Sequence, residues 1–113
     1  MTNKPLSITE LTTCLKVVGD PTRFLILKFV EKKTYCVCEF VEMLQMSQPA
    51  VSQHLRKLKD LDIIKEERRG QWRYFSINKE SMYYSLIQEL LDQSNDGDER
   101  YLQALEREGL ARC

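Results

Sequence analysis

The sequence predicts a mostly helical domain with one small β-hairpin, and three observations support this prediction. Residues 45–61 combine a good helix N-cap at Ser47 with apolar residues at steps of four and three. Residues 39–44 are typical of the end of a preceding helix, and only two residues separate the two helices. Two β-prone runs, 63–68 and 71–77, flank a turn that contains glycine. A helix-turn-helix followed by a hairpin is a winged helix-turn-helix, a fold of the α+β class.

Three helices are predicted before the second helix of the helix-turn-helix, and the third of them is the first helix of that motif. Apolar residues at helical spacing predict a first helix over residues 8–18. Asp20 and Pro21 suit the N-cap and the first helical position of a second helix. After a polar break, we expect Thr34 to cap a short third helix that carries two cysteines and runs to Leu44.

After the hairpin, residues 80–92 are predicted to form a helix with a wide apolar stripe. The stripe could pack on the core of its own chain, but a domain this small has little core left for it. We therefore expect this stripe to form a dimer interface with the first helix. The expected interface residues are Leu11, Leu15, Leu86, Ile87, Leu90 and Leu91. We expect the domain to span residues 1–93, followed by a C-terminal tail, 94–113, that includes a short helix.

Charge is distributed unevenly along the 113 residues, although 17 basic and 17 acidic residues give a net charge of zero. Residues 47–79 hold eight Lys or Arg against four Asp or Glu, and residues 80–113 hold three against eight. A local basic patch is sufficient for contact with phosphates. The sequence contains no apolar run of membrane-spanning length and no signal-peptide pattern in residues 1–6, so we expect a cytoplasmic protein with no membrane partner.

The helix over residues 48–60 has amide, hydroxyl and guanidinium side chains on the face opposite its apolar stripe. Such groups can form hydrogen bonds with base edges in the major groove, although a solvated amphipathic helix would also carry them. The following basic hairpin favours DNA binding, because its arginines can hold phosphates. The candidate DNA-binding residues are Gln48, Ser52, Gln53, His54, Arg56, Arg68 and Arg69.

Four blocks of the sequence support a more specific interpretation. They are residues 15–23 (LKVVGDPTR), 35–39 (YCVCE), 47–55 (SQPAVSQHL) and 69–72 (RGQW). Together they resemble the ArsR/SmtB family of dimeric winged-helix repressors, which leave DNA when a metal or metalloid binds. The resemblance covers about residues 8–92 in the family's order. It implies two partners, double-stranded operator DNA and a second copy of the chain.

Cys36 and Cys38, just before Glu39, look like the ligand motif of the family's arsenite, antimonite and cadmium or lead sensors. The commonest arsenite form has a third cysteine where this chain has Val41, and the cadmium form adds cysteines from an N-terminal extension. The family's zinc sensors use His and Asp on the last helix, where this chain has no His. The resemblance therefore implies As(III) or Sb(III) as the inducer, with Cd(II) or Pb(II) as alternatives.

The sequence contains two further cysteines, Cys14 and Cys113, which are the candidates for a third metal ligand. We expect Cys14 because a thiol placed on a helix needs little further ordering, but Cys113 or an outside ligand remain alternatives. Residues two apart on a regular helix point about 200° away from each other. We therefore expect that ion binding by Cys36 and Cys38 unwinds the first turn of their helix and so disturbs the recognition helix.

The residues and the family resemblance together imply a homodimeric transcriptional repressor of arsenical resistance that leaves operator DNA on binding a thiophilic ion. It does not predict an enzyme, because there is one His and no nucleophile–base pair or phosphate-binding glycine loop. One alternative is a winged-helix repressor that senses Cd(II), Pb(II) or thiol oxidation. Another is a winged-helix module for protein interactions. Titration with arsenite and with peroxide on operator DNA separates these alternatives.

Overall fold

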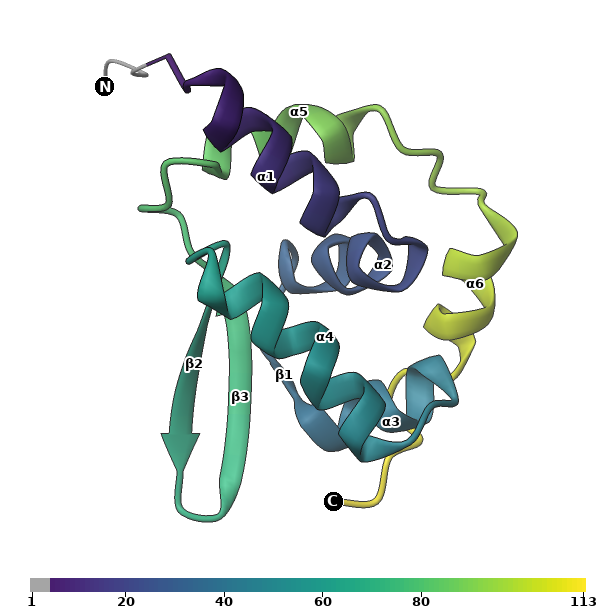
Figure 1. Cartoon of the computed structure of the whole chain (residues 1–113). Coiled ribbons are helices and arrows are strands. Elements are labelled where there is room, and N and C mark those ends of the chain that lie inside the picture. Colours follow the sequence, from purple (N-terminus) through teal and green to yellow (C-terminus); the bar gives the residue numbers. More distant parts are fainter. Residues whose placement is uncertain (1–4) are drawn as a thin grey trace.

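The computed structural model describes residues 5–113, and these form six helices and one three-stranded antiparallel sheet (Figure 1). The winged helix-turn-helix prediction is confirmed. None of the described helices has the length and apolar character needed to cross a membrane. The elements in chain order are α1 (Ile8–Val18), α2 (Pro21–Val30), β1 (Tyr35–Cys36), α3 (Val37–Leu44), α4 (Gln48–Asp60), β2 (Ile64–Arg69), β3 (Trp72–Ile77), α5 (Tyr84–Asp92) and α6 (Glu99–Glu106).

Helix α2 lies at the centre of the fold, with α1, α4 and β3 packed against it. Its start follows the predicted capping pattern, because the Asp20 carboxylate accepts hydrogen bonds from the amides of Thr22 and Arg23 at 2.8 and 3.0 Å. Residues 25–30 are all buried, including Lys28. A helix buried around its whole circumference forms the core on which the other elements rest.

The helix-turn-helix consists of α3 and α4. Gln45 ends α3 in the left-handed conformation, with φ of 53°. Ser47 then caps α4, since its hydroxyl accepts from the Ala50 amide at 3.3 Å. The predicted apolar stripe of α4 is buried at Val51, Leu55 and Leu58. The core therefore holds the orientation of the recognition helix.

The sheet contains one strand that the sequence did not predict. β2 and β3 form the predicted hairpin around Gly70, and β1 adds to the other side of β3. In this pairing Cys36 lies opposite Tyr74. The prediction that Thr34 caps a helix with both cysteines is therefore wrong. Extended pairing with β3 delays the start of α3 to Val37.

Helix α5 also begins later than predicted, at Tyr84 instead of residue 80. Two polar side chains form local turns that keep the intervening residues out of the helix. The Asn78 side chain accepts from the amide of Glu80 at 3.1 Å, and the Ser81 hydroxyl accepts from the amide of Tyr83 at 3.1 Å.

Residues 94–113, which we call the arm, pack against the same core as the rest of the chain. The predicted short helix is α6, in which Tyr101 and Ala104 are buried. Helix α6 contacts α3, and the chain then runs beneath α3 to Cys113, as the yellow segment of Figure 1 shows. The arm thus contributes Tyr101 and Ala104 to one continuous core, and the domain boundary expected at residue 93 stays a prediction.

Candidate functional site

The first turns of α4 carry the residues predicted to read DNA. Gln48, Gln53 and Arg56 are exposed, and Ser52 is partly buried. Because Val51 and Leu55 fix the opposite face in the core, these polar groups face outward on a rigid helix. Amide and guanidinium groups in this position can form paired hydrogen bonds with base edges.

His54 differs from its neighbours on α4 because its ring contacts α2. Arg23 Nη1 lies 3.2 Å from His54 Nδ1, and Arg23 Nε donates to the Val17 carbonyl at 2.6 Å. Burial lowers the pKa of His54, although the nearby Asp20 carboxylate acts in the opposite direction. A neutral ring can accept the Arg23 hydrogen bond through Nδ1. His54 therefore fastens α4 to α2, and its contact with DNA stays a prediction.

The tip of the β2–β3 wing carries Arg68 and Arg69, both exposed. Arg69 Nη2 is 2.9 Å from Glu67 Oε1, and its guanidinium lies 4.7 Å from the Tyr74 ring centroid. Among the described residues Arg68 forms no ion pair. A phosphate near the wing would thus meet Arg68 as an unpaired cation and Arg69 as a cation already paired with a carboxylate.

Glu66 joins the wing to the end of α4. Its carboxylate accepts from Arg73 Nε at 2.7 Å and from Lys59 Nζ at 2.9 Å. These two hydrogen bonds lower the pKa of Glu66 to about 2. The wing therefore carries less net positive charge than its arginines alone suggest, and its position relative to α4 depends on this ionised carboxylate.

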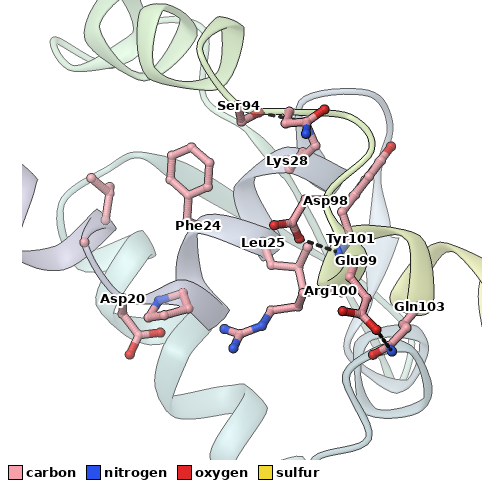
Figure 2. Close-up of a pocket in the computed structure, with 14 residues that line it drawn as sticks. Asp20, Phe24, Leu25, Lys28, Ser94, Asp98, Glu99, Arg100, Tyr101 and Gln103 are labelled. Carbon is pink, nitrogen blue, oxygen red and sulfur yellow. Dashed lines mark hydrogen bonds between the residues drawn. The ribbon is translucent and has the colours of Figure 1, made fainter.

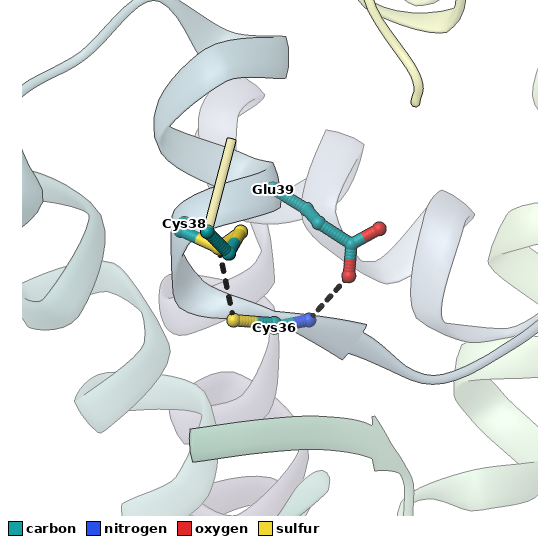
Figure 3. The surroundings of a disulfide bond; sticks show 4 residues. Cys36, Cys38 and Glu39 are labelled. Atoms are coloured by element: carbon teal, nitrogen blue, oxygen red, sulfur yellow. Dashed lines mark hydrogen bonds between the residues drawn. A yellow bond between two sulfur atoms is a disulfide. The ribbon is translucent and has the colours of Figure 1, made fainter. Parts of the chain in front are cut away.

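Cys36 and Cys38 lie at the junction of β1 and α3. Cys36 is the extended N-cap residue of α3, with φ of −88° and ψ of 153°, and Cys38 is in the first helical turn. Their Sγ atoms are 3.1 Å apart, and the Glu39 carboxylate accepts from the Cys36 amide at 2.8 Å (Figure 3). The expectation that the helix must unwind to bring the thiols together is wrong, because the helix begins after Cys36.

Cys113 completes a group of three sulfurs. It forms a disulfide bond with Cys38, with the two Cα atoms 6.0 Å apart (Figure 3). The Sγ atoms of Cys36, Cys38 and Cys113 all lie within 4.8 Å of one another. Cys36 is buried, Cys38 is half-buried and Cys113 is exposed, so the group extends from the core to the surface. Among the described residues no carboxylate or imidazole belongs to this group.

Cys14, which was the expected third ligand, lies in the core and outside this group. Its side chain on α1 is fully buried. Burial raises the pKa of the Cys14 thiol to about 11, so the neutral thiol is its stable form. The position of Cys14 on the first helix did identify it as inward-facing, but the inward direction leads to apolar packing and away from the other sulfurs.

The candidate dimer residues are divided between core and surface. Ile87 and Leu91 are buried by their own chain, while Leu15 is 46% exposed. The other three, Leu11, Leu86 and Leu90, are partly buried. Part of the stripe on α5 thus packs on the core, which was the alternative considered above, and the rest remains accessible.

A cleft of about 960 Å³ lies between α2 and the first half of the arm (Figure 2). Its lining mixes Lys28 and Arg100 with the carboxylates of Asp20, Asp98 and Glu99. Lys28 is already engaged by the arm, as the dashed line to Ser94 shows. The charges of both signs do not converge on one point, so we assign no ligand to this cleft.

Sequence reasoning missed the contacts that bring Cys113 to the other thiols. Arg107 Nη1 donates to the Met43 carbonyl at 3.3 Å, and the Tyr35 hydroxyl donates to the Glu108 carboxylate. The sequence does contain one signal for this docking. Three lysines between residues 28 and 33 face an arm in which acidic residues predominate.

Comparisons with known proteins agree with this architecture. Residues 20–66 match the family model described as "Bacterial regulatory protein, arsR family". The chain is 34% identical over 94 residues to the "Arsenical resistance operon repressor" of Staphylococcus xylosus, which covers 83% of this chain and 88% of that protein. It is 32% identical over 88 residues to the "Transcriptional repressor SdpR" of Bacillus subtilis, with 78% and 97% covered. Among solved structures, NolR from Sinorhizobium fredii has a TM-score of 0.64 and 27% identity, over 79% of this chain and 94% of that one.

The matched residues 20–66 include the helix-turn-helix and the pair Cys36 and Cys38. The family consists of regulators that bind DNA, which confirms the prediction that the chain is not an enzyme. The similarity to the Staphylococcus xylosus protein extends over most of both chains. This chain belongs to the arsR family of bacterial regulatory proteins.

Proposed function

We propose that this chain is a homodimeric repressor that binds operator DNA and releases it when As(III) or Sb(III) binds to Cys36 and Cys38. Helix α4 reads bases through Gln48, Ser52, Gln53 and Arg56, and the wing holds phosphates. Several relatives named for arsenical resistance support an arsenical as the inducer. Thiolates without a histidine or carboxylate favour a soft, thiophilic ion over Mg²⁺ or Ca²⁺.

The observation that carries this proposal is the 3.1 Å separation of the Cys36 and Cys38 sulfurs at the start of α3. With metal–sulfur bonds of about 2.3 Å, two sulfurs that share an ion lie roughly 3.5–4 Å apart. The pair is therefore close to the spacing that an ion requires, with no turn of helix to unwind.

The position of the pair explains how ion binding can affect DNA binding. Cys36 belongs to β1, which pairs with the wing strand β3 opposite Tyr74. Cys38 belongs to α3, which packs on α4. An ion that spreads the two sulfurs moves β1 and α3 apart, and these elements support the wing and the recognition helix. A coupling of 1–3 kcal/mol is typical of such linked sites and changes DNA affinity about 5- to 150-fold.

The test uses the reduced protein and a duplex that this protein selects from random-sequence DNA. Arsenite should release the wild-type protein from the duplex. Cys36→Ser and Cys38→Ser should each retain DNA binding and lose this release, while Cys14→Ser, a change in a thiol outside the group, should respond as the wild type. Normal release from both serine variants would refute the site.

The dimer in this proposal uses α1 and the turn just before α5. Large apolar side chains are exposed there, with Ile8 81%, Leu15 46% and Met82 57% exposed. A second copy of the chain would cover them and give the two-fold symmetry expected of an operator-binding protein. Leu15→Glu should give monomers in sedimentation and weak operator binding. Leu102→Glu, at a leucine of α6 that is 43% exposed, is the matched control and should leave the dimer intact.

A second candidate function, sensing of thiol oxidation, is favoured by the Cys38–Cys113 disulfide. One molecule of peroxide would oxidise the two thiols to the disulfide and be reduced to two molecules of water. If oxidation is the signal, peroxide should release DNA from the wild type and from Cys36→Ser but not from Cys113→Ser. An absence of any peroxide effect on DNA binding would exclude this function.

A further inference from the structure

The arm is anchored at its start by an ion pair between the buried Lys28 and the exposed Asp96. Lys28 Nζ donates to the Ser94 hydroxyl at 2.7 Å and to the Asp96 carboxylate at 2.6 Å. Lys28 is only 6% exposed, so these two contacts replace most of the water that would otherwise surround its charge. Detachment of the arm would break both contacts and would remove the Tyr101 ring, whose centroid lies 4.7 Å from Lys28 Nζ, so these interactions oppose detachment.

The middle of the arm is held by aromatic packing. The Tyr101 ring lies 5.1 Å from that of Phe29, measured between centroids, and is buried. Its hydroxyl accepts a hydrogen bond from Lys32 Nζ at 2.9 Å. Tyr101 thus places α6 on the outer surface of α2.

The end of the arm contacts both ends of α3. Arg107 donates to the carbonyl of Met43 in the last turn, and Cys113 is bonded to Cys38 in the first turn. Between these two points Glu108 accepts from the hydroxyl of Tyr35, the residue before Cys36. Gly109, with φ of 86°, allows the chain to turn from α6 toward the thiols. The arm therefore delivers Cys113 to the pair along a fixed path.

We propose that the arm supplies Cys113 as the third thiolate of a three-sulfur site for trivalent arsenic, with all ligands from one chain. This inference rests on the proposed function, because it assumes that Cys36 and Cys38 hold the same ion. The three sulfurs within 4.8 Å match the pyramid of three sulfurs that As(III) forms. The group lacks the fourth ligand that a tetrahedral zinc site requires.

The binding step is an exchange of ligands without a change in the oxidation state of arsenic. Arsenous acid loses three As–O bonds and gains three As–S bonds. Each thiol proton leaves with a hydroxide as water, so three molecules of water are released. The Cys38–Cys113 disulfide must first be reduced, which takes two electrons and two protons. A phosphine supplies the electrons and becomes a phosphine oxide with the oxygen of one water molecule, and that water supplies the two protons.

A docked arm makes the third bond favourable. If residues 94–113 were unstructured, binding of Cys113 would require ordering of the chain at that moment. Because Tyr101, Arg107 and Glu108 already hold the arm in place, only the last few residues need to adjust. The third As–S bond is then an intramolecular event with a high effective concentration of the thiol.

The experiment compares two arsenicals on phosphine-reduced protein. Arsenite can bind three thiols, and phenylarsine oxide can bind only two. Cys113→Ser should weaken arsenite binding on the order of 100-fold or more, as expected for loss of one intramolecular contact, and leave phenylarsine oxide binding unchanged. X-ray absorption of the arsenite complex should show three sulfur neighbours in the wild type and two in Cys113→Ser.

Arsenite affinity and sulfur count that are the same in Cys113→Ser and the wild type would overturn this inference. If phenylarsine oxide still binds through Cys36 and Cys38 in that case, the proposed function is unaffected. If neither arsenical binds the wild type, the proposed function fails as well.

A second pair of variants tests the docking of the arm with all thiols present. Arg107→Ala removes the contact with the Met43 carbonyl, and Arg112→Ala changes an exposed arginine of the same arm. Arg107→Ala should weaken arsenite binding several-fold and leave phenylarsine oxide binding unchanged, whereas Arg112→Ala should alter neither. Equal arsenite affinity in both variants would contradict a docked arm as the source of the third ligand.

Discussion

The proposed DNA-reading surface and the thiol group share α3 and the β-sheet as supports, but they are assembled from different stretches of chain. The reading surface comes from α4 and the hairpin, which are consecutive in residues 48–77. The thiol group joins Cys36 and Cys38 to a cysteine 75 residues beyond Cys38. The first depends on local capping and on the core, and the second depends also on the docking of the arm. Some substitutions should therefore abolish the function of one region, DNA binding or arsenite binding, and leave that of the other intact.

The largest effect, on the free energy of unfolding, is expected from a substitution in the core that supports both regions. Leu55 on α4 is fully buried, and Leu55→Ala should lower the free energy of unfolding by about 2–5 kcal/mol. Loss of this side chain should reduce both DNA binding and arsenite binding at elevated temperature. Urea unfolding measures the effect. Leu102→Ala, at an exposed leucine of the arm, is the control and should change stability by less than about 0.5 kcal/mol. Equal stability of the two variants would show that α4 does not rest on the core as described.

A smaller effect, confined to the reading surface, is expected from Gln53→Ala. Loss of its amide should cost about 1–3 kcal/mol of discrimination between the selected duplex and a mismatched one. Arsenite affinity should not change, since Gln53 is exposed on α4 and does not belong to the thiol group. Competition binding with the two duplexes is the measurement, with Gln103→Ala on the arm as the control. Unchanged discrimination would remove Gln53 from the base-reading residues.

The stability that ionised Glu66 contributes by linking the wing to α4 should depend on pH. The pKa of Glu66 is lowered to about 2, so its ionised form stabilises the fold above its unfolded-state pKa of about 4.5. This contribution, about 1–2 kcal/mol after screening by solvent, should be lost as the pH falls from 4.5 toward 2. Urea unfolding between pH 6 and 2 should show a weaker pH dependence for Glu66→Gln than for the wild type. Glu89→Gln, at an exposed carboxylate of α5, is the control and should behave as the wild type. A wild-type pH dependence in Glu66→Gln would contradict this assignment.

The smallest effect is expected at the wing tip. Arg68→Ala should weaken binding to all DNA sequences and reduce the slope of log affinity against log salt by about 1, the value for one phosphate contact. Arg69→Ala should have less effect, because Arg69 is already paired with Glu67. Affinity titrations at several salt concentrations test both. A slope that neither variant changes would mean that the wing tip does not touch phosphate.

The difference in assembly also explains which features could be predicted from the sequence. The caps at Asp20 and Ser47 and the buried stripe of α4 are determined by neighbouring residues, and they were predicted correctly. The strand β1 was missed because two residues form a strand here only through pairing with β3, about 40 residues later. That pairing determines where α3 starts, and hence whether the two thiols can meet.

Local patterns do not contain the information that shows whether Cys14 or Cys113 lies beside Cys36 and Cys38. Helical periodicity showed that Cys14 faces inward, but it could not show that this direction leads to the core and not to Cys36. Conversely, a polar linker at residues 94–98 is typical of a mobile tail, yet Lys28 and Tyr101 hold the following segment against α2. The acidic character of the arm opposite a cluster of lysines was the one signal of this docking in the sequence.

The central claim is that ion binding at the thiols and DNA binding at α4 and the wing are coupled. The most direct test uses the reduced protein and measures two affinities. The affinity for DNA is measured with and without saturating arsenite, and the affinity for arsenite is measured with and without saturating DNA. Linkage requires that the two ratios be equal, and we predict that each ligand weakens the other on the order of 10- to 100-fold. A DNA affinity that saturating arsenite leaves unchanged would contradict the claim.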